Sequence, residues 1–156
     1  MSNRRTHRTV GAAVGAASAL VMLEKNATPL ESVAEIFGGG LGGILGSALP
    51  DIVEPATSPN HRDIFHSAAA AAGLVRQARR RVSTYQRALC TKADAYAVKR
   101  KQPDASFLDQ LIAFIAEIGL RVAAGFVSAL APGYLSHLAL DASTPKSIPL
   151  LAARVF

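Results

Sequence analysis

The sequence lacks tryptophan, has a single cysteine and carries few aromatic and charged residues. Only 6% of its 156 residues are aromatic and 18% are charged, whereas half are apolar. A lone cysteine excludes an internal disulfide and is typical of a reducing compartment. Because Cys90 lies in a basic segment without a neighbouring histidine, we expect a bystander thiol and not a nucleophile. No segment alternates apolar and polar residues as a half-buried strand would.

The spacing of apolar residues and breaks predicts one all-α domain over residues 1–156, a compact bundle of about five helices. We expect helices over residues 6–23, 29–48, 62–101, 105–130 and 134–141, of which the third is long, central and basic. Pro50 should end the second helix, and Pro132 with Gly133 should separate the last two. Thr28, Pro29 and Glu31 have the order of a capping box with proline at the first helical position.

The second predicted helix contains six glycines within residues 38–46. Each glycine costs a solvated helix about 1 kcal/mol, so this composition suits a helix whose backbone packs tightly against another. Gly38, Gly42 and Gly46 would then share one face. A flexible loop is the alternative.

The segment 105–130 is the most hydrophobic, and only three charged residues interrupt it near one helical face: Asp109, Glu117 and Arg121. Such a helix suits a soluble core, or a membrane bundle with the charges turned inward. Arginines followed by an apolar stretch at residues 10–23 imitate a signal peptide. We expect a retained helix instead, because His7 would otherwise be lost.

The formal charge of +6 is concentrated near the N-terminus, at Arg4, Arg5 and Arg8, and over Arg76–Lys101. Clusters of this kind bind anionic lipid headgroups or nucleic-acid phosphates, although a solvated helix face has the same composition. No interleaved aromatic residues mark a base-stacking surface. Nucleic-acid binding through Arg76–Lys101 therefore stays an alternative.

Histidines and carboxylates gather in a short central segment, residues 49–67. It contains Asp51, Glu54, His61, Asp63 and His66, and the other two of the four histidines are His7 and His137. His137 and Asp141 are four residues apart, so in a helix they share a face. Imidazoles and carboxylates are the ligands of zinc and manganese. We expect the fold to bring these segments to one divalent ion; unrelated caps and hydrogen bonds are the alternative.

Several of these pieces together resemble the membrane-bound metal-dependent hydrolases, a family of small bacterial inner-membrane proteins of which some are described as LexA-regulated. The matching pieces are Thr6–His7, Leu49–Pro50–Asp51, His61–Arg62 with His66–Ser67, and residues 133–151. The resemblance implies six metal ligands: His7, Asp51, His61, His66, His137 and Asp141. It also implies that Arg62 faces the substrate. The family usually has Asp-x-Asp after this leucine-proline pair, whereas this chain has Val53 at the position of the second aspartate. The chain therefore lacks one carboxylate that could bind a second metal.

The expected activity is hydrolysis by a metal-activated water, with zinc as the first choice and manganese or magnesium as alternatives. Asp51 or Glu54 would act as general base, and Arg62 would stabilise charge on a phosphoester that is anionic and perhaps lipid-like. We expect a membrane-associated protein of the bacterial inner membrane with its site on the cytoplasmic side; a soluble cytoplasmic protein is the alternative. A non-catalytic membrane or assembly protein with a structural metal site also fits these residues.

Overall fold

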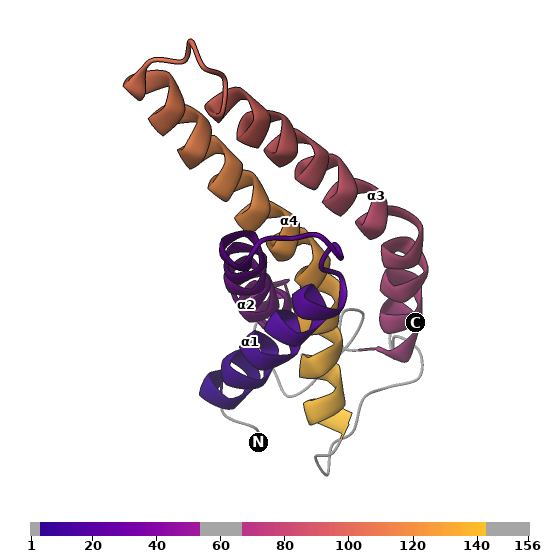
Figure 1. Ribbon diagram of the computed structural model, residues 1–156. Coiled ribbons are helices and arrows are strands. Elements are labelled where there is room, and N and C mark those ends of the chain that lie inside the picture. Colours follow the sequence, from indigo (N-terminus) through magenta and orange to yellow (C-terminus); the bar gives the residue numbers. More distant parts are fainter. Residues whose placement is uncertain (1–3, 54–66, 143–156) are drawn as a thin grey trace.

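The described residues form an all-helical bundle, as predicted. The computed structural model describes residues 4–53 and 67–142, without the side chain of Arg79. Its four helices are α1 (Arg4–Val21), α2 (Pro29–Val53), α3 (Ala68–Arg100) and α4 (Phe107–Ala142). No strand occurs in those two ranges. The central helix α2 packs against both α1 and α4, while α3 lies along α4 (Figure 1).

The turn between α1 and α2 has the predicted capping box. The Thr28 backbone N–H donates to the Glu31 carboxylate at 2.6 Å, and the Glu31 N–H donates to the Thr28 hydroxyl at 3.4 Å. Pro29 is the first helical residue. This reciprocal pair fixes where α2 begins and holds α1 and α2 as a hairpin.

The glycines of α2 form two packing faces, which confirms a helix and not a loop. On the first face, a Cβ atom added to any of the three predicted glycines would meet a main-chain carbonyl oxygen of α4. The opposed pairs are Gly38 with Val122, Gly42 with Phe126, and Gly46 with Leu130. The contact is therefore backbone to backbone, which only glycine permits.

The second face of α2 lies against α1. A Cβ atom on Gly43 would meet the carbonyl oxygen of Gly11, and one on Gly15 would meet that of Gly39. Ala19 closes this contact and is 1% exposed. Because both faces need glycine, α2 is held tightly on two sides and positions its last turn firmly between α1 and α4.

Two prolines lie inside helices, contrary to the predicted breaks. α2 continues through Pro50 to Val53, and α4 continues through Pro132 to Ala142, so the expected separate helix 134–141 is the end of α4. Proline removes the N–H that would bond the carbonyl four residues earlier. At Pro132 that carbonyl belongs to Ser128, and the Ser18 hydroxyl of α1 donates to it at 3.4 Å. Tertiary packing thus replaces the lost bond.

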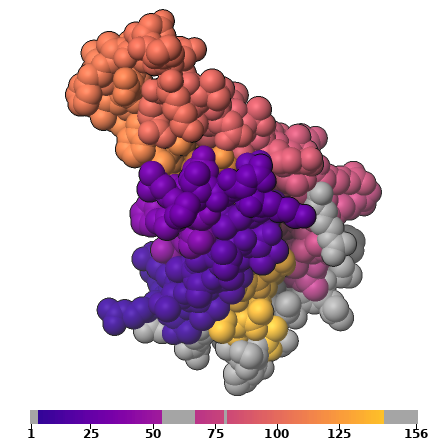
Figure 2. All heavy atoms as spheres, in the orientation of Figure 1, coloured from indigo at the N-terminus to yellow at the C-terminus, as the bar shows by residue number. Residues whose placement is uncertain are grey.

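Helix α3 begins at Ala68, and the Ser67 hydroxyl accepts from the Ala70 N–H as its N-cap. Residues 62–66, where we predicted this helix to start, lie outside the described residues. The far ends of α3 and α4 form a hairpin that extends beyond α1 and α2 (Figures 1 and 2). The described basic residues of the first half of α3, Arg76, Arg80 and Arg81, are exposed. Nucleic-acid binding by this face stays a prediction.

Helices α2 and α4 are each long and apolar enough to cross a membrane. Large apolar side chains are exposed on the outer sides of both, among them Val33 and Phe37 on α2 and Ile112 and Ile115 on α4. Contiguous exposed apolar surface is uncommon on soluble monomers and is expected where lipid is the solvent.

Candidate metal centre

Three helix ends bring four of the predicted ligands together at one end of the bundle. His7 lies near the start of α1, Asp51 in the last turn of α2, and His137 with Asp141 near the end of α4. α1 runs away from this end, whereas α2 and α4 run toward it, so residues far apart in sequence meet here. Each of His7, His137 and Asp141 offers a ligand atom, and these atoms lie within 4.8 Å of one another.

Distances within the cluster are those between ligands around one ion. His7 Nε2 lies 3.6 Å from Asp141 Oδ1, and His137 Nε2 lies 3.5 Å from Asp141 Oδ2. Asp51 Oδ1 is 3.7 Å from His137 Nε2. A tetrahedral zinc ion with bonds of about 2.0–2.1 Å would hold its donor atoms roughly 3.4 Å apart. His7, His137 and Asp141 therefore fit a zinc-sized ion with little movement, and Asp51 lies next to His137 on the side of α2.

A main-chain carbonyl of α2 orients the imidazole of His137. His137 Nδ1 lies 2.6 Å from the carbonyl oxygen of Ser47, which can only accept, so Nδ1 carries the proton. In the neutral imidazole, Nε2 then presents its lone pair toward Asp51 and Asp141. Metal-binding histidines are commonly fixed through their second nitrogen in this way. The His7 ring stacks on it, with centroids 4.0 Å apart.

The four side chains differ in exposure. Those of His7, His137 and Asp141 are 6%, 1% and 4% exposed, whereas that of Asp51 is 31% exposed. Asp51 also lines a pocket of about 180 Å³ between α1 and α2. A small molecule can therefore approach the cluster from the Asp51 side.

The pocket over the cluster is basic. Arg4 and Arg8, one turn apart on α1, line it together with His7 and Asp51. Two guanidinium groups beside the candidate ligands make this pocket suited to an anion. The sequence singled out these arginines only as part of a general basic cluster; the signal that we missed is their spacing around His7.

The remaining predicted site residues are Glu54, His61, Arg62, Asp63 and His66, and all of them lie outside the described residues. Their expected roles as general base, ligands and substrate-binding arginine stay predictions. Asp51 and the two residues after it, which are described, end α2 beside the cluster.

A second polar cluster, which the sequence did not predict, lies farther along α4 around Arg121. Its guanidinium group contacts four carboxylates: Glu35 at 2.9 Å, Asp94 at 2.6 Å, Glu31 at 3.2 Å and Glu24 at 3.3 Å. Glu117 pairs instead with Arg100 at 3.1 Å. Asp109, predicted on the same inward face, is exposed and accepts from the Ser106 hydroxyl. Of these three charged residues of α4, Glu117 and Arg121 face inward and Asp109 does not.

The Arg121 cluster connects α2, α3 and α4 with the turn that follows α1. Gln86 of α3 donates to Glu35 at 3.3 Å and to the Met22 carbonyl after α1 at 3.2 Å. Arg121 lies on α4, and Glu31 and Glu35 lie on α2. Sequence could have indicated it through Glu31 and Glu35, which are one helical turn apart and precede an otherwise uncharged stretch. We assign it a structural role.

Comparison with protein families places this chain in a known group. No curated protein and no solved structure matches the chain. The profile of the YdjM inner membrane protein family matches residues 1–152. The match includes α1 to α4 and both polar clusters. It agrees with the two apolar helices and with the expected membrane localisation. The chain belongs to the YdjM inner membrane protein family.

Proposed function

We propose that this protein is a metal-dependent hydrolase of a phosphoester at the membrane. The observation that carries the proposal is the convergence of His7, His137 and Asp141, from opposite ends of the chain, with ligand atoms within 4.8 Å of one another. Asp51 completes the set on the side of the pocket. Two imidazoles and two carboxylates are a suitable ligand set for zinc, with manganese as an alternative.

A divalent ion held here would polarise a phosphoryl oxygen and supply a hydroxide nucleophile at neutral pH. The protein contributes the ligands and their orientation. Ser47 fixes the tautomer of His137 through its carbonyl oxygen. Asp141 is buried between both imidazoles and suits a purely ligating role.

Asp51 is the best placed of the described carboxylates to move a proton. It is the most exposed of the four cluster side chains and borders the pocket. A general base must reach the water that it deprotonates, which a fully buried carboxylate does not. We therefore assign Asp51 as base or as an exchangeable ligand, as the sequence suggested, with Glu54 as the alternative.

Arg4 and Arg8 support an anionic substrate. They lie on the wall of the pocket next to His7, so a phosphate in the pocket would contact both guanidinium groups and the ion. An acyl ester would leave two arginines without an anionic partner. A phosphoester therefore fits better, and Arg62 stays a further candidate for the same role.

The test is turnover of bis(p-nitrophenyl) phosphate and p-nitrophenyl phosphate by detergent-purified protein loaded with Zn²⁺, Mn²⁺ or Mg²⁺. We expect hydrolysis that is lost in Asp141→Asn and reduced about 100-fold or more in Asp51→Asn. Arg8→Gln should raise KM for the phosphoester. Arg5→Gln is the matched control, because Arg5 is exposed on α1 and does not line the pocket.

Bound metal without hydrolysis of any phosphoester or of p-nitrophenyl acetate would favour the structural metal site instead. In that case zinc would raise the melting temperature of the wild-type protein and of Asp51→Asn without any turnover. Equal rates for wild type and Asp141→Asn would contradict the proposal directly.

A further inference from the structure

A second and larger pocket of about 700 Å³ lies between the end of α2, the first half of α3 and α4. Its walls are mainly aliphatic: Leu49 and Val53 from α2, Leu74 and Val82 from α3, and Val127 and Leu130 from α4. The volume is within the range of small-molecule sites, about 300–1,000 Å³. Neither the ligand cluster nor the basic pocket accounts for it.

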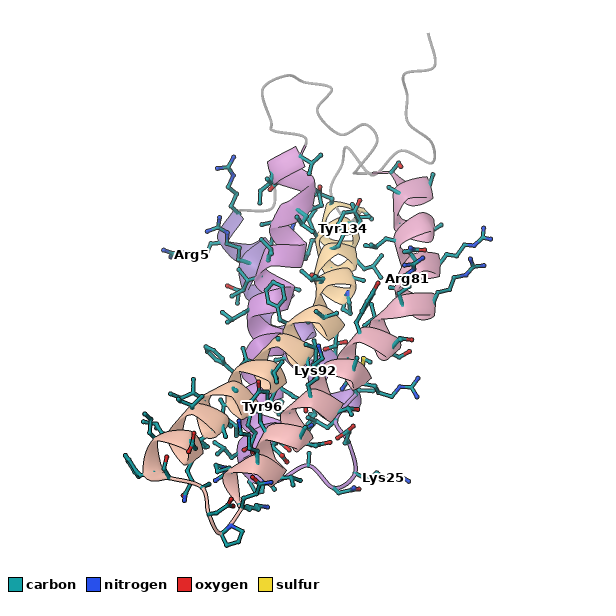
Figure 3. All side chains as sticks on the ribbon, turned by 90° about the horizontal axis from the view of Figure 1, so that it is seen from above. Arg5, Lys25, Arg81, Lys92, Tyr96 and Tyr134 are labelled. Carbon is teal, nitrogen blue, oxygen red and sulfur yellow. The ribbon has the colours of Figure 1, made fainter. Side chains whose placement is uncertain are left out.

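The pocket is elongated along α3. Its lining residues on that helix run from Ala70 to Tyr85, which is about 22 Å at 1.5 Å per residue. Among the described residues that line the pocket, Arg81 alone is charged. Figure 3 labels Arg81 on α3 and Tyr134 on the neighbouring α4, the two helices between which it lies. A long apolar space of this kind suits a hydrocarbon chain.

The apolar pocket and the candidate metal centre lie on two sides of the last turn of α2. Leu49 and Val53 line the apolar pocket, while Asp51, between them on α2, contacts His137. Tyr134 lines it too and precedes His137 by about one turn of α4. The last turn of α2 therefore separates a basic pocket on its α1 side from an apolar pocket on its α3 side.

We infer that the α2–α3–α4 pocket binds the hydrocarbon chain of a membrane lipid phosphate whose phosphate group lies at the candidate metal centre. The inference rests on the proposed function and names its substrate class. Arg4 and Arg8 would hold the anion, and the aliphatic walls would hold the chain. A lipid is the expected source of the chain, because α2 and α4 can span a membrane and the family is an inner-membrane one.

Two glycines allow a matched test of this pocket. A Cβ atom added to Gly73 on α3 or to Gly119 on α4 meets nothing within 4 Å, so a side chain introduced at either position begins in open space. Gly73 lines the apolar pocket and Gly119 does not. Both substitutions also replace a helical glycine by a better helix former, so neither variant should lose its fold.

The experiment measures binding, which does not depend on turnover. Wild type, Gly73→Leu and Gly119→Leu in nanodiscs are titrated with oleoyl glycerol phosphate and with glycerol phosphate. We expect Gly73→Leu to weaken binding of the lipid phosphate by about tenfold or more and to leave glycerol phosphate unchanged. Gly119→Leu should match wild type for both.

Equal affinity of Gly73→Leu and wild type for oleoyl glycerol phosphate would overturn the inference, whatever the hydrolysis assays show. Selective loss in Gly73→Leu would support it even if no hydrolysis is found, in which case only the proposed function fails. If the protein hydrolyses soluble phosphoesters but Gly73→Leu and wild type bind oleoyl glycerol phosphate equally, the proposed function holds and the inferred substrate class is wrong.

Discussion

His137 connects the packing of two helices to the geometry of the candidate metal centre. Its Nδ1–H bonds the Ser47 carbonyl, and its Nε2 faces Asp51 and Asp141. The backbone of α2 thus determines the tautomer of a residue on α4. A change in the packing of α2 on α4 would therefore alter the ligand geometry before it unfolded the protein.

Cys90 illustrates the opposite case, a side chain whose chemistry the structure suppresses. It lies on α3, outside the two helices long enough to span a membrane, and its exposure is 0%. Burial, reinforced by the negative charge of Glu35, raises the pKa of the Cys90 thiol to about 12. The expectation of an inert thiol is consistent with this environment.

We predict that maleimide reacts with Cys90 at pH 8 about 100-fold or more slowly in the folded than in the denatured protein, because only the thiolate attacks. A Thr91→Cys substitution in a Cys90→Ala background is the control, since Thr91 is exposed on the same turn. Mass spectrometry of quenched samples gives both rates. Fast labelling of native Cys90 would contradict the described packing.

Arg121 stabilises the fold at the other polar cluster. We predict that Arg121→Met lowers the free energy of unfolding by about 3–5 kcal/mol, because Glu31 and Glu35 are left buried without their cation. Thermal unfolding in detergent measures the loss. Arg87→Met on the exposed side of α3 should cost no more than about 0.5 kcal/mol.

Adding Glu35→Gln to Arg121→Met separates charge from packing. Partial recovery of stability in the double variant is expected, because one of the uncompensated charges is removed. No recovery, or a mild effect of Arg121→Met alone, would mean that the cluster is hydrated and contributes little.

At the scale of the helices, the contact between α2 and α4 depends on the absence of side chains. We predict that Gly42→Ala destabilises the protein by about 1–3 kcal/mol, because its Cβ would meet the Phe126 carbonyl oxygen. Gly40→Ala is the control: its Cβ approaches nothing closer than 3.9 Å, so the better helix propensity should stabilise by up to about 1 kcal/mol. Melting temperatures that fall equally in both variants would contradict this packing.

The sequence predicted those features of the helices that depend on neighbouring residues. Thr28 and Glu31 form the expected cap, and the spacing of Gly38, Gly42 and Gly46 predicted a packed face. The errors are at Pro50 and Pro132, where proline does not end the helix. Ser18, from another helix, satisfies the Ser128 carbonyl. A single sequence does not show such a distant replacement.

The same distinction applies to the candidate site. The types and local spacing of His7, His137 and Asp141 indicated ligands, and the structure brings them together. That Arg4 and Arg8 line the pocket follows only from the packing of α1 against α2. The Arg121 cluster was missed because the partners of Arg121 come from α2, α3 and the turn after α1, so no local pattern contains it.

At the scale of the whole molecule, the two polar clusters are at different depths of the bundle. Arg121 and His137 are separated by about 24 Å along α4, at 1.5 Å per residue. α2 carries no charge between Glu35 and Asp51, and α1 none between Arg8 and Glu24. This uncharged layer approaches the thickness of a bilayer's hydrocarbon core, about 30 Å. We propose on this basis that the candidate metal centre lies at one face of the membrane, where lipid phosphates are found.

The central claim is that α1, α2 and α4 together hold one divalent ion, and metal content tests it most directly. Purified wild type should contain about one zinc-class ion per chain after dialysis, whereas His137→Ala and Asp141→Asn should bind it about tenfold or more weakly. Ser136→Ala is the control, because Ser136 is buried next to His137 in the sequence and its hydroxyl donates to the Gly133 carbonyl oxygen within α4. Equal metal content in all four proteins would contradict the account.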